Sequence, residues 1–269
     1  MSIKTVACII ARTVSTRLPL KVLRNVVSDF SMLDFIIQRL KQVKNIDEIY
    51  LCTSIESVDD ILSDVAKKNK IKMYRGSADA VIERLISVGE KECADNIIRV
   101  TGDNVFTSVE YIDEQISVHN NNGLDYTRVM DVPIGASAEI MKLTALKKCY
   151  DLIDPSISEY LLLYMFEPRQ FKCGVLTIKD FKKSSDYSVT VDTPEDLVRT
   201  KTIFELYGNN PLQIKLKDII DIIDSNNIEN SKFKLSGNVK MPYGKEISFE
   251  EFQEDMNRRR KQSTHYSLG

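Results

Sequence analysis

The sequence predicts an α/β fold with a mainly parallel sheet flanked by helices. The first observation behind this prediction is a series of apolar runs of strand length, each separated from the next by a segment of helical periodicity. The second is the length of 269 residues, which suits one large α/β domain or a domain with an appendage. Such sheets bind ligands beyond the carboxyl ends of their strands, so we expect a site in the loops that follow the apolar runs.

The first half of the chain has the order β-α-β-α-β-α-β, which predicts parallel strands joined by right-handed crossovers. Its first helix has apolar side chains on one face from residue 32 to residue 40, with Ser31 as the N-cap. The second helix is expected behind a Ser57 cap, and the third at about 79–94. The strands between them are expected at 5–10, 48–53, 71–74 and 96–100.

The second half is less regular and begins after a helix near 108–120. Thr193 and Pro194 predict a helix start, because threonine caps well and proline suits the first helical position. The stretch 226–244 is polar and loop-like, and 250–261 predicts a charged surface helix. Its basic residues face solvent, pack on a partner subunit or reach an acidic substrate. Further strands are expected at 125–129, 138–141, 171–177 and 188–191, and further helices at 143–152, 159–166, 193–207 and 216–225.

Composition excludes several classes of protein. With 43% hydrophobic and 28% charged residues the chain has the composition of a globular protein, and its formal net charge of −2 favours neither nucleic acid nor a membrane surface as partner. The longest apolar run, at 161–166, is far shorter than the roughly 20 residues of a membrane-spanning helix. The N-terminus lacks the pattern of a secretory signal, so we expect a cytoplasmic protein.

Cysteine and histidine restrict the chemistry further. The five cysteines include no Cys-x-x-Cys pair, which favours reduced side chains over a disulfide framework. The two histidines, His119 and His265, offer little material for a zinc site or a Ser-His-Asp triad. Any metal is therefore expected to be a hard ion bound by carboxylates.

The loop after the first strand, 11–21, carries three cations and three hydroxyls. Arginine offers phosphate a planar fork and lysine a mobile point charge. The glycine patterns of dinucleotide-binding and P-loop proteins are absent from the chain, so bound phosphate would depend on these side chains. The alternative is a solvated loop with incidental salt bridges, but the position after the first strand favours a functional loop.

Two aspartates end strand-like runs. Asp103 follows the run 97–101 in a Thr-Gly-Asp turn, and Asp192 follows the run 189–191 just before the capped helix. Because Mg²⁺ prefers one or two carboxylates together with phosphate and water, both residues are candidate ligands. The alternatives are a common surface turn for Asp103 and a part in helix capping for Asp192.

The segments 12–23, 74–79 with Arg84 following, 99–103 and 191–197 resemble the cytidylyltransferase superfamily. Its closest branch is the spore-coat polysaccharide biosynthesis protein F group, with the synthetases of CMP-linked acidic sugars as relatives. The match is collinear from about residue 5 to 207, and its most specific part is the signature Ser-Thr-Arg-Leu-Pro-x-Lys, matched by Ser15 to Lys21.

The resemblance implies a Rossmann-like nucleotidyltransferase fold of the GT-A-like kind, with a small irregular subregion for substrate binding and dimerisation. It implies a cytidylyltransferase domain at 1–210, with a nucleotide half at 1–122 and an acceptor half at 123–210, before a C-terminal helical extension at 211–269. The implied reaction is Mg²⁺-dependent transfer of CMP from CTP to a sugar or small acidic metabolite, with release of pyrophosphate, in surface polysaccharide biosynthesis. A homodimer is implied as well.

Residue by residue, the resemblance makes Arg12, Lys21 and Asp103 catalytic, with Arg12 and Lys21 binding the triphosphate. Asp103 and Asp192 become the Mg²⁺ ligands. The other residues implied to contact CTP or shape its loops are Ala11, Ser15, Thr16, Arg17, Arg75, Gly76, Ser77, Asp79 and Thr101.

The implied acceptor contacts are Glu139, Glu159 and Tyr160, with Arg128 to balance an anionic acceptor. The alternative is that Glu159 caps its own helix and Glu139 is simply exposed. The sequence departs from the family pattern at Val14 and Leu20, where relatives often have glycine, and at Tyr160, where they often have histidine.

Two other functions are compatible with the sequence. A nucleotide-sugar-dependent glycosyltransferase also places a metal carboxylate at a strand end, but it more often carries Asp-x-Asp where this chain has Asp103-Asn104-Val105. A non-catalytic nucleotide-binding protein is the other alternative. The presence of Arg12 and Lys21 together with both aspartates argues against it.

Overall fold

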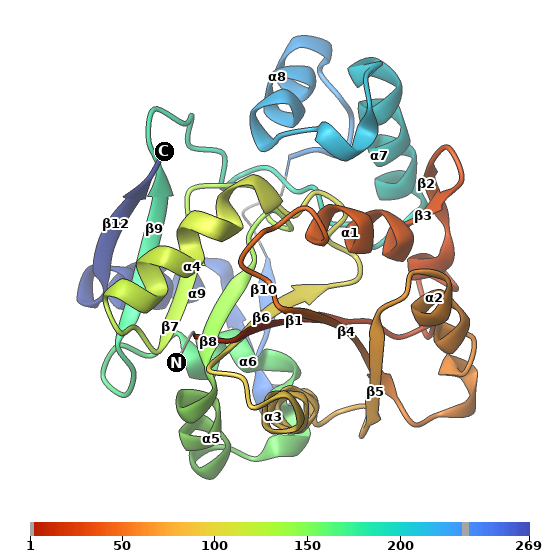
Figure 1. Cartoon of the computed structure of the whole chain (residues 1–269). Helices are drawn as coiled ribbons and strands as arrows, with labels where there is room; N and C mark the ends of the chain where they lie inside the picture. The colour runs from red at the N-terminus through yellow and green to blue at the C-terminus, as the bar shows by residue number, and fades with distance from the viewer. Residues whose placement is uncertain (1–2, 233–236) are drawn as a thin grey trace.

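The computed structural model describes residues 3–232 and 237–269, without the side chain of Glu159. An eight-stranded sheet crosses the molecule in the order β12-β9-β7-β8-β6-β1-β4-β5, with helices on both faces (Figure 1). All its neighbouring pairs are parallel except those of β8, which runs antiparallel to β6 and β7. The predicted, mainly parallel α/β sheet is therefore confirmed. Its strands are β1 (Thr5–Ile10), β4 (Glu48–Ser54), β5 (Lys72–Gly76), β6 (Asn96–Thr101), β7 (Tyr126–Val129), β8 (Glu139–Lys142), β9 (Cys173–Ile178) and β12 (Thr264–Leu268).

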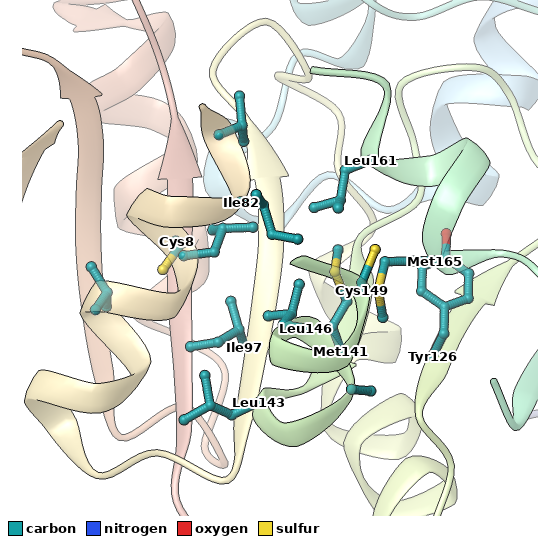
Figure 2. Packing of buried hydrophobic residues seen from close by; sticks show 14 of the residues in the cluster. Cys8, Ile82, Ile97, Tyr126, Met141, Leu143, Leu146, Cys149, Leu161 and Met165 are labelled. Carbon is teal, nitrogen blue, oxygen red and sulfur yellow. The ribbon is translucent and has the colours of Figure 1, made fainter. Parts of the chain in front are cut away.

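The central strand β1 is buried on both faces, which explains its continuous apolar run. Ala7 and Ile9 contact the cluster formed by α1 (Met32–Leu40), α2 (Leu62–Lys68) and α4 (Ile112–Asn121). Val6 and Cys8 belong to the cluster on the opposite face, under α3 (Val81–Glu92), α5 (Leu143–Leu152) and α6 (Leu161–Met165). Figure 2 shows this second cluster, in which Ile82 of α3 lies over the sheet. Because successive side chains of β1 point to opposite faces of the sheet, this one strand contacts the helix layers on both sides.

A third cluster joins the β2–β3 hairpin to α7 (Pro194–Tyr207) and α8 (Leu216–Asn226). The Phe204 ring of α7 lies 4.9 Å from the ring of Phe35 and 5.0 Å from the ring of Phe106, measured between centroids. This packing holds the C-terminal part of α7 against α1 and against the segment that follows β6. The hairpin strands are β2 (Asn25–Val27) and β3 (Phe30–Ser31).

The C-terminal segment differs from the expected helical extension. It contains α9 (Phe249–Gln262), but it also contains a hairpin of β10 (Asn238–Lys240) and β11 (Glu246–Ser248), and β12 extends the main sheet beside β9 (Figure 1). Two residues of the basic run contact the rest of the chain instead of solvent. Arg259 donates to the carbonyls of Leu163 and Phe166, and Arg260 makes two hydrogen bonds to the carboxylate of Asp131.

Three local predictions are wrong. Ser57 does not cap α2; it starts the 3-10 helix η2 (Ser57–Asp59), and α2 begins later. The stretch 188–191 is not a strand, because its hydrogen bonds go to the separate segments around Ile134 and Asp103. The helix expected at 159–166 is divided into the 3-10 helix η4 (Pro155–Tyr160) and α6. The other 3-10 helices are η1 (Lys21–Leu23), η3 (Val109–Tyr111), η5 (Pro211–Gln213) and η6 (Pro242–Gly244).

The caps predicted for α1 and α7 are confirmed as complete capping boxes, formed by Ser31 with Asp34 and by Thr193 with Asp196. Within the described residues no helix is long and apolar enough to cross a membrane.

Candidate active site

The ammonium group of Lys21 lies between two carboxylates. Its Nζ is 2.8 Å from Oδ2 of Asp103 and 2.8 Å from Oδ1 of Asp192. Burial by itself lowers the pKa of Lys21, but the two carboxylates outweigh it, so the pKa is raised above its ordinary value. Arg17 adds a second cation, 3.4 Å from Asp192. Three of the four residues assigned to triphosphate and metal, Lys21, Asp103 and Asp192, therefore meet in one place.

The position of Asp103 depends on the glycine before it. A Cβ at Gly102 would lie 2.9 Å from the Cβ of Ala11 and 3.2 Å from a methyl carbon of Leu33, so only glycine allows the turn to approach β1 so closely. The Gly102 amide also donates to the carbonyl of Ile10, at 2.8 Å. The turn after β6 is thereby joined to the loop after β1.

The position of Asp192 depends on the capping box of α7. Asp196 accepts hydrogen bonds from the backbone amides of Asp192 and Thr193, at 3.0 and 2.9 Å. The amide of Val191 donates to the carbonyl of Asp103, at 3.0 Å. Asp192 therefore contributes its backbone to the cap, as one interpretation predicted, while its carboxylate is free to contact Lys21.

A cavity of about 280 Å³ opens beside this cluster. Of the residues assigned to the nucleotide, five line it: Ala11, Arg12, Lys21, Thr101 and Asp103. Ser15 is half-buried in the loop between them, and Thr16 and Arg17 are exposed there. Arg84 and Arg99 also line the cavity, so most of the charged residues in its described wall are cations.

The loop after β1 is held by Asp59, a residue without an assigned role in the sequence analysis. Its carboxylate is 0% exposed and accepts hydrogen bonds from the amide and hydroxyl of Thr13, and from the hydroxyls of Thr53 and Ser54. Burial raises the pKa of Asp59, but these donors outweigh it and the pKa is lowered. No sequence pattern predicts this contact, because Asp59 lies 46 residues from Thr13.

The side chain of Arg75 is directed to a protein contact. Its Nε donates to the carbonyl of Ser54 at 2.9 Å, its Nη2 donates to the carbonyl of Glu56 at 3.0 Å, and its Nη1 is 2.6 Å from Asp60. Arg75 thus joins the end of β5 to the segment that contains Asp59.

The rest of the turn expected beside the nucleotide has local contacts. A Cβ at Gly76 would lie 2.8 Å from Cγ of Arg84, so this glycine makes room for the stem of that arginine. The hydroxyl of Ser77 accepts a long hydrogen bond, 3.5 Å, from the amide of Ala80. Asp79 is exposed, 3.8 Å from Nη1 of Arg12.

The carboxylate of Glu139 is not exposed, which contradicts the simpler interpretation of this residue. Glu139 is 7% exposed, accepts a hydrogen bond from Nη1 of Arg99 at 2.5 Å and accepts another from the hydroxyl of Tyr126. Burial raises the pKa of Glu139, but the charges of Arg99 and Arg128 outweigh it and lower the pKa. Glu139 is therefore occupied by protein partners.

Arg128 and the η4 segment complete the residues assigned to the acceptor. The guanidinium of Arg128 lies 5.8 Å from the ring centroid of Phe166, and its buried Nε has no hydrogen-bond partner among the described residues. Tyr160 is half-buried at the end of η4, whose Ser158 hydroxyl accepts a hydrogen bond from the amide of Ile82 at 3.0 Å. Glu159 has its backbone in η4, but its side chain lies outside the described part of the chain.

The comparison with protein families and curated proteins agrees with this geometry. The family model described as Cytidylyltransferase matches residues 6–219. Spore coat polysaccharide biosynthesis protein SpsF of Bacillus subtilis is 31% identical over 223 residues, which are 80% of this chain and 92% of SpsF.

Among solved structures, a cytidylyltransferase from Leptospira borgpetersenii is similar, with a TM-score of 0.77 and 26% identity over 86% of this chain and 99% of its own. A CMP:2-keto-3-deoxy-manno-octonic acid synthetase complexed with CTP has the same fold, with a TM-score of 0.59 and 18% identity over 76% of this chain and 99% of its own. The expected Rossmann-like nucleotidyltransferase fold is thereby confirmed. The chain belongs to the cytidylyltransferase family and is a CTP-dependent nucleotidyltransferase.

Proposed function

We propose that the protein is a Mg²⁺-dependent enzyme that transfers CMP from CTP to a sugar or small acidic metabolite for surface polysaccharide biosynthesis. The observation that carries this proposal is the contact of Lys21 with both Asp103 and Asp192. It brings a phosphate-binding cation and two hard oxygen ligands together beside a cavity. The name of the SpsF relative supports the polysaccharide context.

The two aspartates fit a magnesium ion. Both carboxylates are partly exposed, at 26% and 31% of their side chains, so they are accessible to an incoming ion. No group of three or more histidine, cysteine or acidic side chains in the described chain is placed to hold a metal. The two carboxylates of Asp103 and Asp192 suit Mg²⁺, which takes one or two carboxylates and completes its octahedron with phosphate and water. When bound, the ion would neutralise charge on the triphosphate.

The residues of this chain would then contribute position and charge. The acceptor oxygen attacks the α-phosphorus of CTP, the bond to the bridging oxygen breaks, and pyrophosphate leaves. Arg12 and Lys21 hold the triphosphate in place and stabilise the negative charge that develops on the pyrophosphate. The chemistry needs no protein nucleophile, which fits a chain with two histidines.

For the acceptor, the described contacts favour an anionic group. Glu139 is paired with Arg99, whereas the guanidinium of the half-buried Arg128 makes no hydrogen bond or ion pair with the described residues. An acceptor carboxylate or phosphate would supply the missing partner for Arg128. A homodimer, a cytoplasmic location and the division of the chain at residue 210 remain predictions.

Family membership favours nucleotidyl transfer over the glycosyltransferase alternative. The test is a pyrophosphate-release panel in which CTP, UTP, ATP and GTP are each combined with acidic sugars, neutral sugars and small phosphorylated metabolites, with Mg²⁺ or with EDTA. We expect release with CTP, Mg²⁺ and an anionic acceptor. Asp103→Asn is the control for contaminating activity. Release that is equal in EDTA, or that requires a purine nucleotide, would contradict the proposal.

A further inference from the structure

Arg84 is a buried cation without a counter-ion among the described residues. It is 1% exposed, and its Nε and Nη1 have no hydrogen-bond partner. Its one side-chain hydrogen bond within the described part of the chain is long, 3.3 Å from Nη2 to the carbonyl of Ala78. Burial lowers the pKa of Arg84, and the charge of Arg12 lowers it further. An unpaired charge in such a place destabilises a folded protein.

The other fully buried arginines show that this fold normally satisfies such groups. Arg39 donates to the carbonyls of Thr107 and Ile214 and pairs with Glu110. Arg199 pairs with Asp196 and donates to two backbone carbonyls. Each of these two leaves only its Nε without a partner. Arg84 differs because a second nitrogen, Nη1, is also unsatisfied and no carboxylate of the described residues lies within ion-pair distance.

The unsatisfied guanidinium lines the cavity of the candidate active site. Ala78 and Val81 line the cavity together with Arg84. Asp103 and Lys21, the residue that contacts Asp192, line the same cavity. Because Gly76 has no Cβ, it leaves space for the aliphatic stem of Arg84. The triphosphate already has Arg12, Arg17 and Lys21 as cations, so a further phosphate contact is not what the site lacks.

Among the described cations that line the cavity, Arg84 is the one with two buried nitrogens that lack a partner, so it is the strongest candidate donor for the base. Arg75, which the resemblance places among the residues that contact CTP or shape its loops, already contacts Ser54, Glu56 and Asp60 through each of its three nitrogens. The small apolar side chains of Ala78 and Val81 beside Arg84 suit a flat, uncharged ring. A guanidinium can only donate, and cytosine presents two adjacent acceptors, O2 and N3. Uracil has an N–H at position 3, which would face the guanidinium donor to donor.

We propose that Arg84 determines the base specificity of this enzyme by donating to the O2 and N3 edge of the cytosine of CTP. The inference rests on the binding of CTP and on no particular acceptor or metal. The bound base thus accepts hydrogen bonds from the nitrogens of Arg84 that have no partner among the described residues of the free protein. Because Arg84 contacts the base and not the reacting phosphorus, it determines the affinity for CTP and takes no part in the chemical step.

The test compares Arg84→Met with Arg39→Met, which removes a buried arginine that has its partners. Thermal unfolding is measured without ligand, and binding is measured by calorimetry with CTP, UTP and inorganic pyrophosphate, with no acceptor present. We expect Arg84→Met to keep or raise the melting temperature and Arg39→Met to lower it. We expect Arg84→Met to weaken CTP binding about 10- to 150-fold, the range for a hydrogen bond to a charged group. Pyrophosphate binding should be unchanged, and the preference for CTP over UTP should fall.

A second variant, Arg84→Gln, retains a donor of similar reach without the charge, and we expect it to bind CTP with intermediate affinity. Three results would overturn the proposal: a melting temperature lowered as far as in Arg39→Met with CTP affinity retained, an equal loss for CTP and UTP, or a loss of pyrophosphate binding. Failure of the pyrophosphate-release panel would leave these binding results intact, so the two proposals are tested separately.

Discussion

The carboxylate of Asp59 accepts hydrogen bonds from both the backbone amide and the hydroxyl of Thr13, at 2.7 and 2.6 Å. This contact joins the loop after β1 to the loop after β4, and Arg75 joins the latter to the end of β5. Arg12 is the neighbour of Thr13. The buried network around Asp59 therefore fixes the backbone next to Arg12, the cation assigned to the triphosphate.

Thr13→Val should test this positioning, because valine keeps the shape of threonine but removes its hydroxyl hydrogen bonds. We expect a loss of about 1 to 2 kcal/mol in stability and a rise in the KM for CTP, since the loop that holds Arg12 becomes less well ordered. Thr13→Ser keeps the hydroxyl and should restore the KM. Steady-state kinetics on both variants, with chemical denaturation as the stability measure, provide the comparison. A Thr13→Val enzyme with lower stability and unchanged KM would show that the network is only structural.

Asp103→Asn and Asp192→Asn should each abolish Mg²⁺-dependent turnover while the protein remains folded. Both carboxylates contact Lys21 at the surface of the site and not in the core, so their loss removes charge without leaving a cavity. The measurement is pyrophosphate release at increasing Mg²⁺, with circular dichroism as the control for folding. Wild-type Mg²⁺ dependence in either variant would show that the residue is a surface or capping aspartate and not a metal ligand.

Lys21→Met and Arg12→Ala should affect the triphosphate differently. An interaction made mainly in the transition state lowers kcat, whereas uniform binding raises the KM for CTP. We expect the larger kcat effect at Arg12, because its guanidinium can hold two phosphate oxygens at once. Wild-type kinetics in both variants would favour the solvated-loop interpretation.

The raised pKa of Lys21 also predicts a pH effect on stability. A raised pKa in the folded state stabilises the fold while the lysine is protonated in both states, that is, below its ordinary value of 10.5. This contribution is lost as the pH rises through the raised pKa. Thermal unfolding between pH 8 and pH 11 should therefore show a smaller alkaline loss in Lys21→Met than in the wild type. Parallel curves for the two proteins would contradict this prediction.

Glu139→Gln should destabilise the protein and reduce its sensitivity to acid. The carboxylate is buried against Arg99 and Tyr126, and breaking a buried pair by removing one charge costs about 3 to 5 kcal/mol. Because the pKa of Glu139 is lowered in the folded state, its stabilisation is present above the ordinary glutamate pKa and is lost as the pH falls through the lowered value. Unfolding curves from pH 3 to pH 7 should show a smaller acid-induced loss of stability in Glu139→Gln than in the wild type. Equal acid sensitivity of variant and wild type would exclude Glu139 as the source.

The order of strands and helices followed from periodicity for most of the chain, since a side chain's face depends only on its spacing along the element. β1, with the expected bounds 5–10, and α5, with 143–152, are examples. The stretch 188–191 was harder, because an extended backbone becomes a strand only if a neighbouring strand pairs with it. For the same reason β12 could not be placed on the edge of the sheet from its sequence.

The sequence by itself determined the α/β class, the family resemblance and the two candidate aspartates, because these depend on residue types at fixed spacings. The tertiary structure alone decided which charges meet. Lys21 pairs with aspartates 82 and 171 residues away, and Arg75 is directed to the loop after β4. Arg84 has no counter-ion in the part of the chain that the structure describes. The energy of a charge depends on its burial and on partners within a few ångströms. Both are fixed only when distant segments pack together, so no local pattern can encode them.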